Sequence, residues 1–270
     1  MKLSISNIAW SMEYDEEMYT FLSKNGFAAI EIAPTRIFQD NPYDKLKEAK
    51  KWAENLKSNY NLSISSIQSI WYGKKENLFT SKEEQKKLID YTKKAVLFAE
   101  SINCHNIVFG CPRNRDTDLP FSEALSKSKY FFYEIGEFAK KHNTVIAIEA
   151  NPEIYNTHFV NYTKEAFEAS RNIGSTGFMV NVDLGTIIQN EEEFSLFEDY
   201  TNIINHIHIS EPNLEIIKKR KFHSKLFRIL KNHKYSNYVS IEMKNCNDIE
   251  KVKKVALYIK KCKEEVFNAD

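Results

Sequence analysis

Eight short apolar runs, rich in β-branched residues, recur along this chain of 270 residues and separate longer stretches of helical periodicity. The runs are LSISNIAW (residues 3–10), AAIEIAP (28–34), LSISSIQSI (62–70), NIVFGC (106–111), VIAIEAN (145–151), GFMVNVD (177–183), INHIHISE (204–211) and YVSIEMK (238–244). Their last residues lie 24 to 41 positions apart, which leaves room for one helix and two loops in each interval. The sequence therefore predicts a repeated strand-helix unit.

The best defined of the predicted helices begins after Ser81. Ser81 and Glu84 have the spacing of a capping box, in which each side chain accepts a hydrogen bond from the other residue's backbone N–H. The residues that follow form one apolar stripe at helical spacing, made of Leu88, Tyr91, Ala95, Phe98 and Ile102. This stripe is expected to face the sheet.

Two further helices have recognisable ends. We expect Asp15 to cap a short helix that ends at Asn25 and Gly26, and Thr163 to begin a helix that ends at Gly174. Glycine favours the left-handed position that follows many helices, so both endings agree with this assignment.

Eight strands that alternate with helices over about 250 residues are typical of a (β/α)8 TIM barrel. We therefore predict an α/β chain that forms a single TIM-barrel domain over residues 1–270. A doubly wound open sheet is the alternative. However, no G-x-G-x-x-G or G-x-x-x-x-G-K-[ST] loop follows the first run, and the chain has only seven glycines, so the phosphate-binding loops of that fold are missing.

The charge balance excludes several classes of partner. The chain has 38 Lys and Arg against 37 Asp and Glu, so its net charge of +1 gives no global field that would recruit nucleic acid or a membrane surface. No apolar run approaches the ~18 residues of a membrane span. The four cysteines form no C-x-x-C pair and the first residues lack a signal-peptide pattern, which favours a reducing cytoplasm. A homo-oligomer stays open.

Four of the runs end in or near a residue that can bind a metal: Glu149, Asp183, His208 and Glu242. Strand ends of a barrel meet at one mouth, so these residues are predicted to converge, and one shared cation would compensate carboxylates that are costly to bury. His206 has the same strand phase as His208, but His208 lies nearer the end of its strand. Three carboxylates and one imidazole suit one divalent ion, Mn²⁺, Mg²⁺, Co²⁺ or a catalytic Zn²⁺.

At these residues the chain resembles the xylose-isomerase-like barrel superfamily, the sugar phosphate isomerase/epimerase group. The resemblance lies in IEANPEIYNTHF around Glu149, NVDLGT around Asp183, HIHISEPN around His208 and HSKLFRILKNHKYSNYVSIEM leading to Glu242. It extends over almost the whole chain. It implies one divalent ion held by these four residues, with Glu149 and Glu242 also serving as the catalytic acid/base pair.

The chemistry of such a site agrees with this assignment, because a metal bound to a ketose carbonyl and its neighbouring hydroxyl stabilises the enediolate left by proton abstraction. If Glu149 and Glu242 lie on opposite faces of the sugar, one removes a proton and the other returns one, which gives an epimer. If a single carboxylate shuttles the proton between neighbouring carbons, the product is an aldose. The sequence leaves both reactions open, with a sugar or sugar phosphate as the expected small-molecule partner.

Two departures from the family pattern limit what can be transferred. Many relatives have a histidine three residues after the metal-binding aspartate, where this chain has Thr186. The ketohexose 3-epimerases have an arginine six residues beyond the ligand histidine, where this chain has Leu214. Abasic-site endonucleases of the same fold use a histidine-rich zinc cluster, and this chain has too few suitably placed histidines for that chemistry.

The remaining strand ends supply candidates for substrate binding. They are Trp10, Gln68, Trp71, Arg113, Arg115, Asn151, Asn156, Glu211 and Lys244, with Glu31 and His223 as further pocket residues. Trp10 and Trp71 could stack on a sugar face, and Arg113 and Arg115 offer planar forks for a phosphate or carboxylate. The basic run at residues 218–221 is a weaker phosphate candidate, because a charge run is ordinarily an exposed helix face.

Two other functions use the same residues. A metal-dependent dehydratase of a polyol or keto-cyclitol would remove the same proton and then expel a β-hydroxyl. A non-catalytic sugar-binding barrel would bind a ligand without proton exchange. Solvent deuterium in recovered sugar distinguishes the isomerase class from the dehydratase, whose product has a new enone absorbance.

Overall fold

Each of the eight predicted runs corresponds to one β-strand in the computed structural model, which describes residues 1–197 and 199–269, and only β1 begins before its run, by one residue. The strands are β1 (Lys2–Ile5), β2 (Ala29–Ile32), β3 (Ser63–Ile67), β4 (Ile107–Phe109), β5 (Ile146–Glu149), β6 (Phe178–Asp183), β7 (Ile204–Ile209) and β8 (Tyr238–Ile241). The strands are shorter than the runs, so several of the residues expected at strand ends lie in the loops that follow them.

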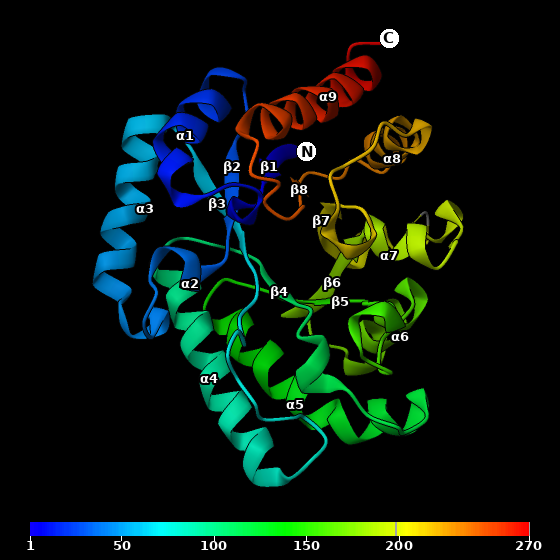
Figure 1. Cartoon of the computed structure of the whole chain (residues 1–270). Helices are drawn as coiled ribbons and strands as arrows, with labels where there is room; N and C mark the ends of the chain where they lie inside the picture. Colours follow the sequence, from blue (N-terminus) through cyan, green and yellow to red (C-terminus); the bar gives the residue numbers. More distant parts are fainter. Residues whose placement is uncertain (198, 270) are drawn as a thin grey trace.

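The strands form one parallel sheet in the order β1-β8-β7-β6-β5-β4-β3-β2. The gap between β1 and β2 is bridged by a parallel contact of Ser6 with Glu31 and by the backbone N–H of Ala28, which donates to the Leu3 carbonyl at 3.1 Å. The predicted (β/α)8 TIM barrel is therefore confirmed (Figure 1). The shortest ladder joins β3 and β4 through a single residue pair, and loops replace the sheet above it.

Helices fill the intervals between strands and surround the barrel (Figure 1). The α-helices are α1 (Asp15–Lys24), α2 (Pro34–Ile37), α3 (Leu46–Tyr60), α4 (Lys82–Ser101), α5 (Phe121–Lys141), α6 (Thr163–Ile173), α7 (Leu184–Gln189), α8 (Lys221–Asn232) and α9 (Ile249–Phe267). The short 3-10 helices are η1 (Asn7–Ala9), η2 (Met12–Tyr14), η3 (Pro42–Asp44), η4 (Pro112–Arg115), η5 (Glu153–Tyr155), η6 (Phe194–Phe197), η7 (Thr201–Ile203) and η8 (Pro212–Leu214).

The start of α4 shows half of the predicted capping box. The Ser81 hydroxyl accepts from the Glu84 backbone N–H at 3.2 Å. The Glu84 carboxylate instead accepts from the backbone N–H of Asn77 at 2.7 Å, which ties the preceding loop to the helix. The predicted stripe faces inward, with Leu88, Ala95, Phe98 and Ile102 buried and Tyr91 half-buried.

The predicted helix ends hold for α1 and α6, but the role expected for Asp15 is wrong. Asp15 is the first residue of α1, and its carboxylate makes no cap hydrogen bond. It accepts from Nε1 of Trp10 at 2.8 Å and pairs with Arg36 at 2.7 Å, and this ion pair keeps it away from the helix terminus. At the end of α6, Gly174 has the expected positive φ of 70°.

The helices also bear on the prediction that nothing in the chain crosses a bilayer. Among the described residues, no helix combines the length and the apolar character that a membrane span needs. The largest apolar side chains instead pack between the helices and the outside of the barrel, as Phe98, Phe132 and Phe227 do.

Candidate metal centre

The four predicted metal ligands meet at the carboxyl ends of neighbouring strands. Glu149 and Asp183 end β5 and β6, His208 lies in β7, and Glu242 directly follows β8. Each offers one ligand atom, and these atoms lie within 4.8 Å of one another. Nδ1 of His208 lies 2.9 Å from Glu149 Oε1 and 3.1 Å from Glu242 Oε2, so the imidazole stands between two carboxylates.

Asp183 is fixed by the turn that begins α7. Its Oδ2 accepts from the backbone N–H of Thr186 at 2.7 Å and from the Thr186 hydroxyl at 3.0 Å. The Ser210 hydroxyl donates to Oδ1. Thr186 also donates to the Ala150 carbonyl at 2.8 Å, so the residue that replaces a histidine of many relatives fastens the aspartate.

Glu149 is held by two amide groups. Asn181 Nδ2 lies 2.5 Å from Oε1, and Asn151 Nδ2 lies 3.1 Å from Oε2. Gly110 makes room for this carboxylate, because a Cβ at that position would lie only 3.0 Å from Glu149 Oε2. Glu242 differs, since among the described residues His208 alone contacts its carboxylate.

The electrostatics of the cluster fit a divalent cation. Burial and the neighbouring Glu149 raise the pKa of Asp183 to about 6, because together they outweigh the lowering effect of His208. Burial likewise raises the pKa of Glu242 to about 7, against the lowering effect of His208. Three buried carboxylates thus share one imidazole, and hard oxygen ligands short of positive charge are the donor set that divalent ions prefer.

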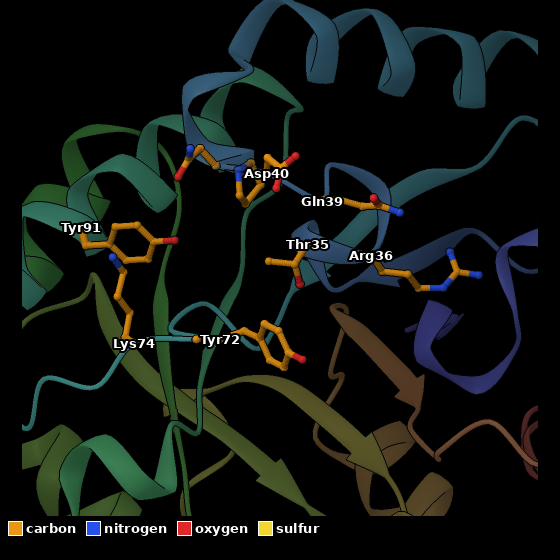
Figure 2. Close-up of a pocket in the computed structure, with 10 residues that line it drawn as sticks. Thr35, Arg36, Gln39, Asp40, Tyr72, Lys74 and Tyr91 are labelled. Carbon is orange, nitrogen blue, oxygen red and sulfur yellow. The ribbon is translucent and has the colours of Figure 1, made fainter.

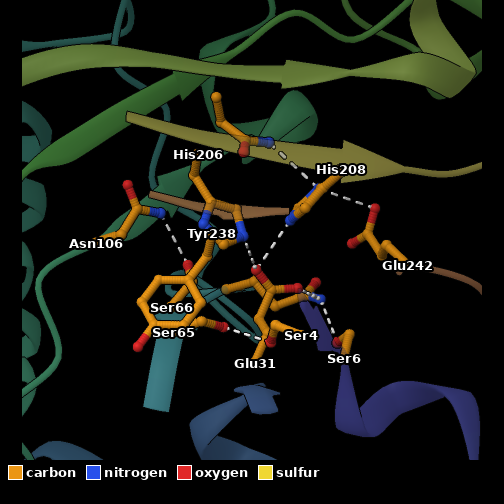
Figure 3. A network of polar contacts seen from close by, with 12 residues as sticks. Ser4, Ser6, Glu31, Ser65, Ser66, Asn106, His206, His208, Tyr238 and Glu242 are labelled. Atoms are coloured by element: carbon orange, nitrogen blue, oxygen red, sulfur yellow. Dashed lines mark hydrogen bonds and ion pairs between the residues drawn. The ribbon is translucent and has the colours of Figure 1, made fainter. Parts of the chain in front are cut away.

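A further carboxylate, that of Glu31, orients His208 from the interior of the barrel (Figure 3). Glu31 Oε2 lies 2.9 Å from His208 Nε2, and Gln68 Nε2 donates to Glu31 Oε1 at 2.9 Å. Burial would raise the pKa of Glu31, but His208 and His206 outweigh it and hold the pKa well below its usual range. A carboxylate on the far nitrogen of a ligand histidine fixes the ring, so Nδ1 is left to face the cluster.

His206 lies deeper in the barrel than His208, with its Nε2 3.2 Å from Glu31 Oε2. Burial lowers the pKa of His206, against the raising effect of Glu31. Both histidines share the inward phase expected from the sequence, and the one nearer the strand end lies among the predicted ligands.

Arg115 lies beside the cluster in a position that the sequence did not indicate. Its side chain is fully buried, and its guanidinium donates only to backbone and amide oxygens among the described residues. The acceptors are the carbonyls of Gly110, Glu149, Phe159 and Val160 and the Oδ1 atom of Asn151. Arg115 was expected at a solvated loop facing substrate, but the structure uses it to hold the backbone of Glu149 and the side chain of Asn151.

A cavity of about 170 Å³ opens above the ligands. Its lining residues are Gln68, Ser69, Val108, Gly110, Cys111, Pro112, Glu149, Asn151, Tyr155, Asp183, Leu214 and Glu242. Of the predicted substrate-binding residues, Gln68 and Asn151 therefore lie at the site. Tyr155, which was not predicted, also lines it, and burial together with Asp183 raises the pKa of its phenol.

Two more predicted residues line an adjoining cavity of about 670 Å³, above β3 and β4. Trp71 is buried there, and its indole donates to Thr92 at 2.9 Å, so its ring packs mainly against Phe109 and Phe131. Arg113 is exposed on the same cavity.

The other four predicted residues lie away from these two cavities. Trp10 is buried and its indole donates to Asp15, and Glu211 is buried and forms an ion pair with Arg220 at 2.5 Å. Asn156 is exposed in a left-handed turn with φ of 56°, and Lys244 is exposed beyond β8. The basic run at 218–221 is already engaged through Arg220.

Strand phase could have identified two supporting residues that the sequence reading missed. Asn181 lies two residues before Asp183, and Ser210 two residues after His208, so each shares the inward face of a predicted ligand. Tyr155 had no such signal, because its direction depends on the turn at η5.

The sequence matches the family described as xylose isomerase-like TIM barrel over residues 20–262. No curated protein matches the sequence.

Several solved structures share the fold at low sequence identity. A D-psicose 3-epimerase crystallised with D-fructose has a TM-score of 0.78 and 16% identity, over 98% of this chain and 99% of that one. A 3-keto-D-glucoside 4-epimerase from E. coli has 0.77 and 15%, over 97% and 100%. The IolI protein with a bound zinc atom has 0.72 and 16%, over 98% of each chain.

Proposed function

We propose that this chain, which belongs to the xylose isomerase-like TIM barrel family, is a divalent-metal-dependent epimerase or isomerase of a ketose or ketose phosphate. The observation that carries the proposal is the convergence of Glu149, Asp183, His208 and Glu242, whose three carboxylates line one cavity. Two of the structures with the same fold described above are named as sugar epimerases, which agrees with this choice.

The four residues would hold one divalent ion. When bound, the ion supplies positive charge beside the carbonyl and neighbouring hydroxyl of the sugar, which favours loss of a proton from the adjacent carbon. Asp183 and His208 are then purely ligands, since Ser210 and Thr186 hold the aspartate and Glu31 holds the histidine.

Glu149 and Glu242 would move the proton. They reach the cavity from β5 and β8, which are not neighbours in the sheet, and both pair with His208 Nδ1. Two carboxylates that approach from different strands can act on opposite faces of one carbon, one removing a proton and the other returning one. This arrangement favours epimerisation over a shuttle between neighbouring carbons by a single base.

Glu242 is suited to donate a proton. Burial raises its pKa to about 7, and among the described residues only His208 forms an ion pair with its carboxylate. A carboxyl group with a pKa near the working pH exchanges protons most effectively.

The test measures solvent-proton exchange after loading with Mn²⁺, Co²⁺, Mg²⁺ or Zn²⁺. A panel of ketoses and ketose phosphates is incubated in deuterated water, and deuterium in the substrate and its epimer is followed by NMR. Glu149→Gln and Glu242→Gln should each slow exchange by about 10²- to 10⁴-fold, while retaining part of the metal. Glu153→Gln, an exposed carboxylate at the same mouth, is the matched control.

Full proton exchange by Glu149→Gln or by Glu242→Gln would contradict the acid/base assignment. Loss of water with a new enone absorbance would replace the epimerase by a dehydratase. Ligand binding without exchange under any metal would indicate a binding protein.

A further inference from the structure

The metal-site cavity is too small to be the whole binding site. At about 170 Å³ it is below the roughly 300–1,000 Å³ typical of ligand pockets. It adjoins the cavity of about 670 Å³ over β3 and β4, since Ser69, Cys111 and Pro112 line both. A substrate that reacts at Glu149 and Glu242 therefore has a second compartment for its far end.

The second compartment is cationic. Lys74, Lys75 and Arg113 line it, and none of its ten lining residues, all of them described, carries a carboxylate. Within the part of the chain that the structure describes, none of these three cations forms an ion pair. The nearby Glu76 carboxylate accepts from the Lys75 backbone N–H at 3.2 Å and does not line the cavity.

The walls of this compartment are held by the fold. The buried Asn114 side chain donates to the carbonyls of Lys74 at 3.1 Å and Glu76 at 2.7 Å, which ties the loop after β4 to the loop after β3. The backbone N–H of Leu78 returns a bond of 2.7 Å to the Asn114 carbonyl. Lys74 and Arg113 are thus carried by two loops that are fixed to each other.

A neighbouring groove of about 560 Å³ provides a contrast (Figure 2). It shares Tyr72, Gly73 and Lys74 with the cationic compartment, but Asp40 lines it and its arginine, Arg36, is already paired with Asp15. Lys74 lines both hollows, and its Nζ lies over the ring of Tyr91 in the neighbouring groove, 3.9 Å from the ring centroid. Lys75 and Arg113 line only the compartment beside the metal centre, so its positive charge is not shared with the groove at these two residues.

We propose that Lys74, Lys75 and Arg113 bind the terminal phosphate of the substrate, so that the natural substrate is a ketose phosphate and not a free ketose. The inference rests on the proposed function of the adjoining cavity. A phosphate monoester carries nearly two negative charges at neutral pH, and three cations complement it better than they would a single carboxylate. The three carboxylates of the metal centre repel the phosphate, which keeps the two ends of the substrate in separate compartments.

The first experiment measures binding of inorganic phosphate by calorimetry at low ionic strength, with the metal removed. The triple variant Lys74→Gln/Lys75→Gln/Arg113→Gln should weaken binding at least about tenfold. The triple variant Lys218→Gln/Lys219→Gln/Lys221→Gln removes the same charge after β7, where TIM barrels often bind phosphate, and should leave it unchanged. The single variant Arg113→Gln, at an exposed position, should also weaken binding and covers the case in which the triple variant misfolds.

The second experiment compares proton exchange in metal-loaded protein for D-fructose, D-fructose 6-phosphate and D-fructuronate, and for D-ribulose with its 5-phosphate. The phosphorylated ketoses should have the higher kcat/KM, and the first triple variant should lower this value at least about tenfold, so that the preference over the free ketoses is lost. Equal use of free and phosphorylated ketose, or preference for the carboxylate, would overturn the inference and leave the proposed function standing. If the first triple variant weakens phosphate binding but no sugar exchanges its proton with solvent, the anion site would be supported and the proposed function refuted.

Phosphate binding that is unaffected by the first triple variant, or that is lost in the control, overturns the inference directly. In that case the cationic residues are a solvated loop, or the phosphate binds after β7.

Discussion

The mouth of the barrel contains two buried charged regions that are balanced in different ways. At the ends of β5 to β8, three carboxylates share one imidazole, and the pKa values of Asp183 and Glu242 rise because burial is not compensated. Arg115, next to them, is equally buried and has five oxygen acceptors without a carboxylate among the described residues. Burial lowers the pKa of Arg115 to about 10, so it stays charged at neutral pH.

The difference shows which buried charges need a ligand. A charge surrounded by fixed backbone dipoles is satisfied by the fold itself, and it stabilises the loops that supply those dipoles. A group of like charges with few donors is incomplete without a cation.

The largest effect is expected for Asp183→Asn, which removes a ligand from the incomplete region. Four ligands share about 10–16 kcal/mol in well-formed zinc sites, so the loss of one should weaken metal binding by about 3–4 kcal/mol, or several hundredfold. Metal content by plasma mass spectrometry and calorimetric titration would measure it, with the exposed Asp118→Asn as control. Unchanged metal content would place the ion elsewhere.

Arg115→Met should act on stability and much less on metal binding. It leaves buried carbonyls without a donor, at a cost of about 2–3 kcal/mol in the free energy of unfolding. Urea denaturation would measure this, and Arg113→Met, at an exposed site, should change stability by less than about 0.5 kcal/mol. Equal midpoints for the two variants would mean that the carbonyls around Arg115 do not depend on it.

Glu31→Gln should weaken metal binding, because it removes the carboxylate that fixes the ring of His208. Loss of an outer-shell carboxylate typically weakens metal binding by about 10- to 100-fold. Histidine ¹⁵N shifts would show whether the proton of His208 leaves Nε2, a change that a purely structural role for Glu31 would not produce. Ser240→Ala, at a buried hydroxyl inside the same barrel, is the control and should alter neither measurement.

The smallest effect is expected for His223, a buried imidazole that belongs to neither of the two charged regions and is uncharged at neutral pH. Its Nδ1 lies 2.9 Å from the Tyr258 hydroxyl, and its Nε2 has no partner among the described residues. Burial lowers the pKa of His223 from 6.5 to about 4, while Glu211 and Arg220 act in opposite directions. Between pH 4 and pH 6.5 the imidazole therefore binds a proton more readily in the unfolded chain than in the folded one. Its contribution to stability is fully present above pH 6.5 and falls as the pH drops towards 4.

His223→Gln should remove this part of the pH dependence. Between pH 7 and 6 the difference from the unsubstituted chain should be below about 1 kcal/mol, and it should grow at lower pH. Urea midpoints across this range would measure it. Parallel curves would show that the imidazole is protonated in the folded state as well.

The sequence predicted the fold and the convergence of four residues because both depend on periodicity. β5 and β6 end at Glu149 and Asp183 themselves, and strand phase alone turns them to the same mouth. Arg115 could not be predicted in this way, since its acceptors come from Gly110, Glu149 and the turn near Val160, which only the folded loops bring together. Trp10 and Tyr155 depended on loop conformation for the same reason.

The two cavities at the mouth meet at only three residues, Ser69, Cys111 and Pro112. On the proposed assignment, reaction and recognition are built on different parts of the chain, because Lys74, Lys75 and Arg113 lie on the loops after β3 and β4, while the predicted metal ligands lie at the ends of β5 to β8. Such a division allows new specificities to evolve by variation in these two loops, with the reactive groups inherited unchanged. It also identifies residues 72–75 and Arg113 as the positions to randomise when this barrel is adapted to a different ligand.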